Sequence, residues 1–275
     1  MPGNLLRQWT QGAASVTDNA YWDDVGEDWT RRAPDTLWRM HSDAVNTRLL
    51  DRWLPRGRVA RLLKTDLFDE ACTEGLAPLL SERAEIVVGV DVSEATIGAA
   101  RSRRPEVAAA FADVRVLPFA DASFDVVVST STLDHFRELT ELGRGLSELH
   151  RVLKPGGRLI VTLDNPSNPV VALRNILPFG LLNRLGLVPY YVGVTCSADQ
   201  LAGMLEERGF AVEETTAILH CPRAIAVLAC RLVAKAGGKA AERRLLAWLS
   251  GFERLAKLPT RYRTGHFVAA SARKR

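Results

Sequence analysis

The stretch Ile86-Val-Val-Gly-Val-Asp-Val-Ser-Glu94 decides the fold class of this chain. Its first five residues carry no charge and are mostly β-branched, which is typical of a strand buried on both faces of a parallel sheet. Asp91 follows at the end of this strand, and Ser93 suits the N-cap of a helix. In open α/β sheets, ligands bind outside the carboxyl ends of the strands. The stretch therefore predicts a strand, a ligand-facing acid and a helix.

The same alternation of short apolar runs and helix-length segments continues on both sides of this stretch. Near-continuous apolar strands that alternate with helices predict a doubly wound α/β sheet with helices on both faces. We expect the other strands at 59–63, 107–111, 124–128, 158–163, 210–216 and 266–270, and the helices at 71–83, 94–103, 138–153 and 197–209.

The N-terminal region has a different pattern. Residues 1–34 are rich in Gly, Asp and Thr and are expected to be irregular, and a helix is expected from Pro34 to Trp53. We therefore expect an N-terminal helical cap over 1–55 and the α/β domain over 56–275.

Two insertions, 166–196 and 222–264, interrupt the α/β pattern and are expected to cover the substrate. The first is apolar and punctuated by Pro and Gly, which indicates either a lipophilic pocket or ordinary packing of a cover on the core. The second holds helical segments at 223–236 and 239–257. The segment 239–257 is amphipathic and basic, so it either packs on its own domain or makes a peripheral membrane contact.

The composition is that of an ordinary globular protein. The chain has 275 residues, of which 47% are hydrophobic and 25% charged. No apolar run reaches the roughly 18 residues that a membrane-spanning helix needs, and Met1-Pro-Gly-Asn4 lacks the features of a signal peptide. Four scattered cysteines without a CxxC pair indicate neither a zinc site nor a disulfide framework. We expect a cytoplasmic α/β enzyme without a metal.

The charge is distributed unevenly. Residues 231–275 carry twelve Lys and Arg against two Glu, hence +10, and since the whole chain carries +4, the first 230 residues carry −6. The basic residues lack aromatic partners at strand positions on which bases could stack, so nucleic acid is not expected as a partner. A small molecule is expected as the partner instead. The chain is expected to be a monomer or a homodimer.

Two acids point to a nucleoside. Asp91 at its strand end suits both hydroxyls of a ribose, unless it only caps the next helix. Asp113 ends the next strand, where it could accept a hydrogen bond from the amine of an adenine while Val114 packs against the ring; the alternative is a turn aspartate. A nicotinamide cofactor is disfavoured because no GxGxxG follows the first strand.

The segments GVDVS, ADVRVLPFADASFDVVVS, STLDHF and LSELHRVLKPGGRLIVT together resemble the class I S-adenosylmethionine-dependent methyltransferase family, of the type 11-like core, over about residues 56–217. The resemblance implies a seven-stranded sheet in the order 3-2-1-4-5-7-6, with the last strand antiparallel. It also implies S-adenosyl-L-methionine as cofactor and methyl transfer to an O, N or C atom of a small, lipophilic acceptor such as a secondary metabolite, a quinone-like molecule or a lipid-linked compound.

The loop after the first strand departs from the family pattern. The family has a glycine-rich loop there, whereas Leu63–Gly75 holds one glycine and, near its start, the acids Asp66, Asp69 and Glu70. These acids could hold the cationic methionine part of the cofactor, and Lys64 could reach its carboxylate. The resemblance assigns Thr65, Val92 and Ser129 to the cofactor as well. The alternative is that the loop has lost cofactor binding and the chain is an inactive binding or assembly protein.

The resemblance also suggests where the acceptor lies. His135 follows the fourth strand, at the edge that faces the methyl group in the family, and could act as a general base because imidazole titrates near neutral pH. The alternative for His135 is helix packing. Asp164 and Asn165, at the tip of the fifth strand, and Tyr190 and Tyr191, in the first insertion, are candidates for substrate binding.

Overall fold

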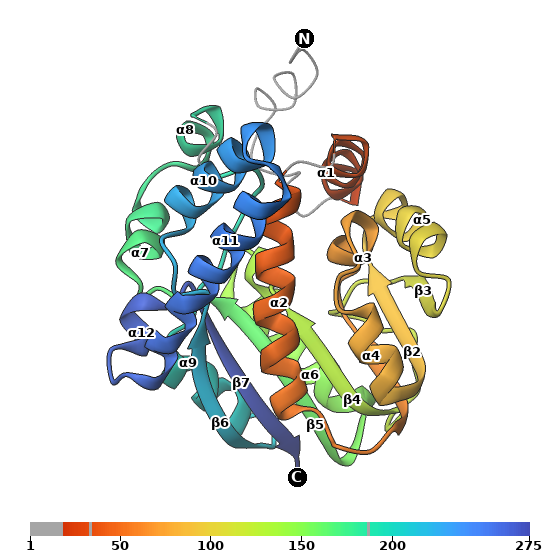
Figure 1. The fold of residues 1–275 in the computed structure, drawn as a ribbon. Coiled ribbons are helices and arrows are strands. Elements are labelled where there is room, and N and C mark those ends of the chain that lie inside the picture. The colour runs from red at the N-terminus through yellow and green to blue at the C-terminus, as the bar shows by residue number, and fades with distance from the viewer. Residues whose placement is uncertain (1–18, 33–34, 186–187) are drawn as a thin grey trace.

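The computed structural model describes residues 19–32, 35–185 and 188–275. Its centre is a seven-stranded sheet in the order β3-β2-β1-β4-β5-β7-β6 (Figure 1). β7 is antiparallel to both of its neighbours, and the other strand pairs are parallel. The predicted order and the antiparallel last strand are thus confirmed. The strands are β1 (Val59–Lys64), β2 (Ala84–Asp91), β3 (Val107–Phe111), β4 (Phe124–Thr130), β5 (Leu153–Asp164), β6 (Phe210–Ile218) and β7 (Phe267–Lys274).

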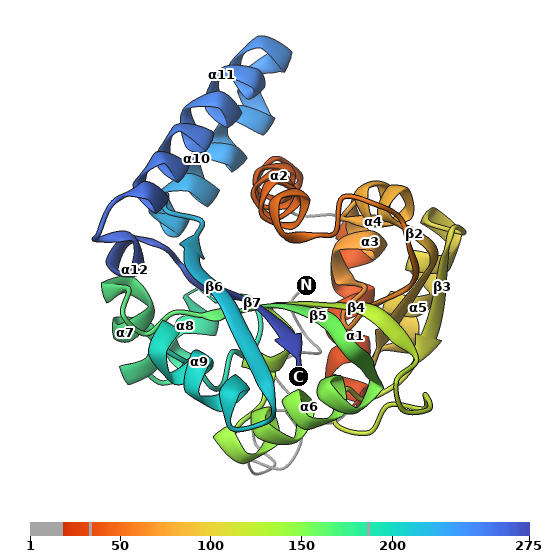
Figure 2. The ribbon, with the colours of Figure 1, turned by 90° about the horizontal axis from the view of Figure 1, so that it is seen from below.

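Helices cover both faces of the sheet (Figure 2). The helices are α1 (Asn19–Arg32), α2 (Thr36–Trp53), α3 (Phe68–Cys72), α4 (Ala77–Arg83), α5 (Glu94–Arg103), α6 (Leu139–Val152), α7 (Pro169–Ile176), α8 (Phe179–Arg184), α9 (Ala198–Glu206), α10 (Arg223–Ala236), α11 (Gly238–Gly251) and α12 (Arg261–Thr264). Two 3₁₀ helices, η2 (Leu133–His135) and η3 (Phe252–Lys257), complete the described elements.

Consecutive strand residues point into two separate cores. Leu62 and Leu63 of β1 are both fully buried, yet Leu62 belongs to the core that includes residues of α2, α4, α5, α10 and α11, and Leu63 belongs to the core that includes residues of α6 and α9. This follows from the two-residue period of a strand, which directs neighbouring side chains to opposite faces. The apolar runs without alternation therefore belong to strands covered on both sides, as predicted.

The N-terminal prediction was wrong over 19–32, which form the helix α1 and not irregular chain; residues 1–18 and 33–34 lie outside the described part. The helix packs on α5 through the buried residues Val25 and Gly26. Gly26 allows this approach, since a Cβ there would lie 2.6 Å from Oγ1 of Thr96. Tertiary packing thus stabilises a segment whose Gly, Asp and Thr content disfavours a helix.

The helix expected at 71–83 is two helices, α3 and α4, separated by a turn. Gly75 in that turn has φ +54°, which side chains rarely adopt. Pro78 lies in the first turn of α4, where its missing N–H costs no hydrogen bond. After this turn the N–H of Leu76 donates to Oε1 of Glu70, whose side chain is fully buried.

The segment 239–257 packs on its own domain. Leu249 of α11 is fully buried, and Leu245 and Phe252 are partly buried against the core shared with α2 and α10. Only Trp248 of its expected apolar face is more than half exposed, at 56%. The helix α11 therefore uses its apolar face internally. None of the helices in the described ranges is long and apolar enough to cross a membrane.

Candidate functional site

A cleft opens at the carboxyl ends of β1, β2, β3 and β4, between these strands and α1. It is lined by the ends of the four strands, by the loop after β1, by α1 and by one residue of the first insertion: Asn19, Trp22, Val25, Thr65, Asp66, Phe68, Asp69, Asp91, Val92, Ser93, Thr96, Ala112, Asp113, Val114, Arg115, Thr130, Ser131, Thr132, His135, Phe136 and Tyr190. Nine of the residues predicted from the sequence lie in this set: Thr65, Asp66, Asp69, Asp91, Val92, Asp113, Val114, His135 and Tyr190.

Asp91 is held rigidly at the end of β2. Its two carboxylate oxygens accept hydrogen bonds from the main-chain N–H groups of Leu67, at 3.0 Å, and Ser93, at 2.9 Å. Ser93, not Asp91, caps α5, because its hydroxyl accepts from the N–H of Thr96. Burial, with a smaller contribution from Asp66, raises the pKa of Asp91 to about 7. Asp91 thus presents a carboxyl group whose ionisation depends on what binds next to it.

Asp113 lies beside Asp91, since the N–H of Ala112 donates to the carbonyl of Asp91 at 3.0 Å. Its carboxylate is already occupied by Arg115, whose Nε lies 3.0 Å from each oxygen and whose main-chain N–H donates at 2.8 Å. Val114 is buried next to it. An amine that binds Asp113 must therefore compete with the guanidinium of Arg115.

The loop after β1 is stabilised from within by a buried ion pair. Lys64 Nζ donates to Oε2 of Glu70 at 2.7 Å, and the N–H of Leu76 donates to Oε1 of Glu70 at 2.9 Å. Burial alone would lower the pKa of Lys64, but the carboxylates of Glu70, Asp66 and Asp69 together outweigh it and hold this pKa above its ordinary value. Lys64 therefore points inward and does not line the cleft, which differs from the expected contact with a cofactor carboxylate.

Two of the three loop acids face the cleft. Asp66 lines it and accepts a hydrogen bond from the N–H of Phe68 at 2.9 Å. Asp69 lines it and pairs with Arg39 at 3.0 Å. Burial raises the pKa of Asp66, and Lys64 opposes this shift. The acidic wall expected from the sequence is thus present, and the charge of Asp66 acts on Asp91.

Helix α1 closes the cleft on the side of α5. Asn19, Trp22 and Val25 line the cleft, and Asp23 accepts a hydrogen bond from the N–H of Ala95 at 3.2 Å. The sequence interpretation missed these residues because it expected irregular chain here. The spacing of Trp22, Val25 and Trp29, three and seven residues apart, was the available signal for one helical face.

Aromatic rings form one wall of the cleft. The ring of Tyr190 lies 6.3 Å from Trp22, 6.1 Å from Trp29 and 6.0 Å from Phe68. The guanidinium of Arg39 lies 4.6 Å from the ring of Trp29 and 4.5 Å from that of Phe68. This wall suits a flat apolar ligand, because aromatic faces pack against such surfaces.

His135 lies at the end of η2, and a hydrogen bond fixes the tautomer of its neutral ring. Nδ1 lies 2.9 Å from the carbonyl oxygen of Tyr191, which only accepts, so Nδ1 is the donor. In the neutral imidazole Nε2 then carries the lone pair. Nε2 lies 4.0 Å from Oδ1 of Asp134, and the ring packs 4.6 Å from Trp22. His135 therefore has the tautomer that a general base in the cleft needs.

Ser129 supports the cleft from behind. It is fully buried, and its hydroxyl accepts a hydrogen bond from Oγ1 of Thr65 at 2.9 Å. Ser131, two residues on, has φ 52° and donates to Asp134 at 2.9 Å. Backbone strain of this kind is often found at functional sites. It turns the chain at the tip of β4 so that residues 130–132 line the cleft.

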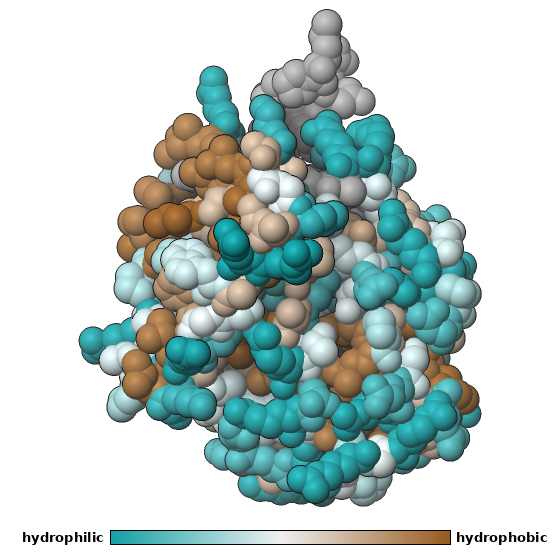
Figure 3. Space-filling view, in the orientation of Figure 1, coloured by the Kyte–Doolittle hydropathy of each residue, from teal (hydrophilic) through white to brown (hydrophobic). Residues whose placement is uncertain are grey.

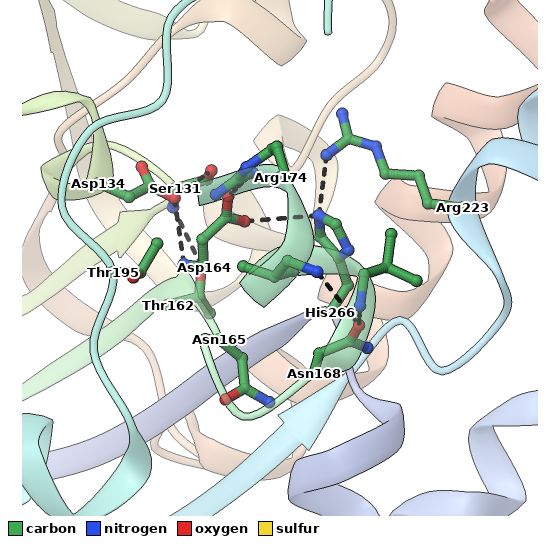
Figure 4. A network of polar contacts seen from close by, with 12 residues as sticks. Ser131, Asp134, Thr162, Asp164, Asn165, Asn168, Arg174, Thr195, Arg223 and His266 are labelled. Atoms are coloured by element: carbon green, nitrogen blue, oxygen red, sulfur yellow. Dashed lines mark hydrogen bonds and ion pairs between the residues drawn. The ribbon is translucent and has the colours of Figure 1, made fainter. Parts of the chain in front are cut away.

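Asp164 and Asn165 belong to a buried polar network behind the cleft (Figure 4). Asp164 pairs with Arg174 and lies 3.6 Å from Nε2 of His266. Asn165 donates through Nδ2 to the carbonyls of Tyr262 and Gly265. Neither is among the residues that line the cleft. The network is connected to the cleft through Asp134, which accepts from the N–H of Asp164 at 3.3 Å and from the hydroxyl of Ser131, a lining residue, at 2.9 Å.

Comparisons with known proteins agree with this geometry. A family profile described as "Methyltransferase domain" matches residues 69–161. A probable S-adenosylmethionine-dependent methyltransferase of Mycolicibacterium smegmatis is 31% identical over 189 residues, which span 68% of this chain and 65% of that protein. The match thus covers slightly less than two thirds of this relative's length. A demethylmenaquinone methyltransferase of Thermus thermophilus is 34% identical over 160 residues, which span 51% of this chain and 71% of that protein.

Among solved structures, a methyltransferase of Thermotoga maritima, described as dependent on S-adenosylmethionine and as a possible histamine N-methyltransferase, aligns with a TM-score of 0.56. The alignment has 18% identity and covers 94% of this chain and 97% of that one. At this identity the likeness concerns the fold.

Proposed function

Since this chain belongs to the class I S-adenosylmethionine-dependent methyltransferase family, we propose that it transfers the methyl group of S-adenosyl-L-methionine to an oxygen, nitrogen or carbon atom of a small lipophilic acceptor. The observation that carries this proposal is the position of Asp91 and His135 in one cleft. The first suits a nucleoside and the second suits proton removal from an acceptor.

The residues present fit the cofactor. Asp91 offers a buried carboxyl group at the end of β2 for the two ribose hydroxyls, and Val92 lies beside it. Val114 and Asp113 would hold the adenine, with Arg115 moving away from Asp113. Asp66 and Asp69 would face the cationic methionine part, in place of the glycines that the family has in this loop.

The Lys64–Glu70 pair explains how the loop holds its shape with few glycines. A buried lysine and a buried glutamate neutralise each other, so the two remaining acids are free to face the cleft. Thr65 is fixed by Ser129 and by Thr132, whose hydroxyl lies 2.9 Å from that of Thr65. In this proposal Lys64 and Ser129 support the site without touching the cofactor.

The bound cofactor supplies an electrophilic methyl group. His135 would accept at Nε2 the proton of an acceptor hydroxyl or amine, which would leave the acceptor atom with the electron pair that methyl transfer needs. The carboxylate of Asp134, 4.0 Å away, stabilises the imidazolium that results. His135 then releases this proton to water. The remaining contribution of the cleft is to hold acceptor and methyl group in line.

The aromatic wall supports an acceptor with a flat, apolar ring. Trp22, Phe68 and Tyr190 line the cleft together with His135. Trp29 packs against Phe68 and Tyr190. The Thermus relative is named for a quinone substrate, which supports a quinone-like acceptor here. We therefore place a lipophilic aromatic or quinol-type compound first among the acceptors.

We also propose that residues 1–55 act as a cap and 56–275 as the catalytic domain. The contribution of α1 to the cleft supports the first assignment, and Tyr190 supports a covering role for the insertion 166–196. Among the described residues of the insertion 222–264, none lines the cleft. That insertion would therefore cover the site without contributing a lining residue.

The test is a transfer assay with methyl-labelled S-adenosylmethionine. Purified protein would be incubated with naphthoquinols that carry an isoprenoid chain, with simple catechols and with a hydrophilic amine as control. We expect label in a lipophilic product and none in the amine. Absence of transfer together with absence of cofactor binding would overturn the proposal and favour a binding or assembly role.

A further inference from the structure

Apolar side chains gather on one exposed side of the molecule. Figure 3 shows them as brown atoms over α7, α8 and α10. They are Val170, Leu173, Ile176, Leu177, Leu181, Leu185, Ile225, Leu228 and Leu232, which we call the apolar surface. Ile176 is 79% exposed and Ile225 is 65% exposed. Exposed apolar patches of this kind mark interaction sites, because single domains seldom leave them in water.

The spacing shows that each helix directs a whole face outward. On α7, Val170, Leu173 and Ile176 recur every three residues. On α10, Ile225, Leu228 and Leu232 recur at three and four residues, so they lie on one side of that helix. The opposite side of α10 packs into the core through Ala226 and Cys230. Helix α10 therefore has two apolar sides, of which one packs into the core and the other belongs to the exposed apolar surface.

The buried network of Figure 4 fixes this orientation. Arg174 of α7 reaches inward to Asp164, and Arg223, the first residue of α10, donates to Nε2 of His266 at 3.1 Å. Asn168 caps α7 through its side-chain oxygen. Both helices thus anchor a polar side chain in the core next to the cleft, and their apolar faces stay outside.

Positive charge accompanies these helices. Arg184 of α8 and Lys235 of α10 are exposed, as is Arg244 on the adjoining α11, where Arg243 is half-buried. A second copy of this chain would present the same charge, whereas a bilayer with anionic lipid would attract it. The combination of exposed apolar and basic side chains favours the bilayer.

The chain that follows α8 connects the apolar surface to the cleft. Helix α8 precedes Tyr190, which lines the cleft, by a few residues, and Asn183 of α8 donates to the carbonyls of Val188 and Pro189. The ring of Phe179 lies 5.6 Å from that of Tyr191, whose carbonyl binds His135. A partner that contacts the exposed face of α8 therefore lies near the segment of Tyr190 and Tyr191 that covers the cleft.

We propose that the apolar surface docks on an anionic lipid bilayer, and that the acceptor reaches the cleft from that bilayer past α8. The route of the acceptor rests on the proposed function, whereas the docking itself does not. The apolar side chains enter the acyl boundary while the basic residues stay at the lipid headgroups.

The test is flotation of the full chain with vesicles of phosphatidylcholine alone and of phosphatidylcholine mixed with phosphatidylglycerol. We expect binding to the mixed vesicles, weakened by salt. The triple variant Ile225→Ser/Leu228→Ser/Leu232→Ser should bind at least tenfold more weakly. Leu139→Ser, which removes a similarly exposed leucine at the start of α6, is the matched control and should bind as the wild type does. Arg243→Gln should weaken binding about fivefold.

Three results would overturn the docking proposal. The first is absence of wild-type binding to the mixed vesicles. The second is unchanged binding of the triple variant, which would move the contact elsewhere. A concentration-dependent dimer that the triple variant abolishes, without vesicle binding, would assign the surface to a second copy and also overturn it. Titration with S-adenosylhomocysteine separates the two claims, since a chain that binds vesicles but not this nucleoside refutes the proposed function alone.

Discussion

His135 donates a hydrogen bond through Nδ1 to the main-chain carbonyl of Tyr191, and the two atoms are 2.9 Å apart. This contact connects η2, at the end of β4, to the insertion that follows β5. It fixes the imidazole tautomer and places Nε2 as the free acceptor. The segment that carries Tyr190 and Tyr191 therefore also positions the proposed base. Proton removal by His135 thus depends on the insertion that covers the cleft.

The substitution His135→Asn should separate binding from catalysis. The shorter amide side chain would keep a donor for the Tyr191 carbonyl but would have no Nε2. We expect kcat to fall by about 10²–10⁴ with an acceptor that loses a proton. S-adenosylhomocysteine affinity, measured by calorimetry, should stay within a factor of two or so of wild type. A variant with wild-type kcat would assign His135 to packing.

Asp91→Asn should weaken cofactor binding at least tenfold, or about 1.4 kcal/mol, because a carboxylate accepts from both ribose hydroxyls and an amide does not. Hydroxyl donors favour the ionised form of Asp91. Since burial raises its pKa to about 7, wild-type affinity should rise as the pH increases through 7. Calorimetry across this range checks both effects, with the exposed Glu207→Gln as control. Equal pH profiles for wild type and Asp91→Asn would contradict the assignment.

The Lys64–Glu70 pair should be costly to break on one side. Glu70→Gln leaves a buried ammonium without its counter-ion, so we expect a loss of about 3–5 kcal/mol in the free energy of unfolding. The double variant Lys64→Met/Glu70→Leu removes both charges and should lose less. Urea denaturation measures both. If the single and double variants were equally destabilised, the pair would not be the source of the effect.

Acid should destabilise the fold through His266. Burial lowers the pKa of His266 to about 3, from an ordinary value of 6.5. Between these values the unfolded chain binds a proton that the folded chain does not, so the free energy of unfolding falls as the pH decreases from 6.5 toward 3. The limiting slope for one proton is about 1.4 kcal/mol per pH unit. Burial also raises the pKa of Asp134 to about 6, which acts in the opposite direction.

His266→Gln tests this dependence, because glutamine still accepts a hydrogen bond from Arg223 but does not titrate. Thermal or urea unfolding at several pH values between about 4 and 7 should show a flatter curve for the variant than for wild type. Parallel curves would show that other groups control the acid sensitivity.

The sheet could be predicted from the sequence because its strands are buried on both faces. Residues 86–90 and 126–130 lack charge, and helix-length segments separate the strands. Asp91 and His135 could be located for the same reason, since each follows a strand that the pattern identifies. The parallel arrangement then brings their strand ends to one edge.

What the sequence could not provide depends on tertiary contacts. Helix α1 has weak helix propensity and forms because Gly26 fits against α5. The inward direction of Lys64 depends on Glu70, six residues further along the chain. Asp164 was expected to bind substrate, yet its partner Arg174 comes from an insertion whose apolar pattern indicated a lipophilic pocket or a packed cover, and not an ion pair with β5. Pairings of this kind have no periodic signal in the chain.

Calorimetric titration of the purified protein with S-adenosylhomocysteine measures whether a glycine-poor, acidic loop still forms a cofactor site. We expect binding in the micromolar range, with one molecule bound per chain. A folded protein that shows no heat of binding at millimolar nucleoside would contradict the account, and methyl transfer could then not be the activity of this cleft.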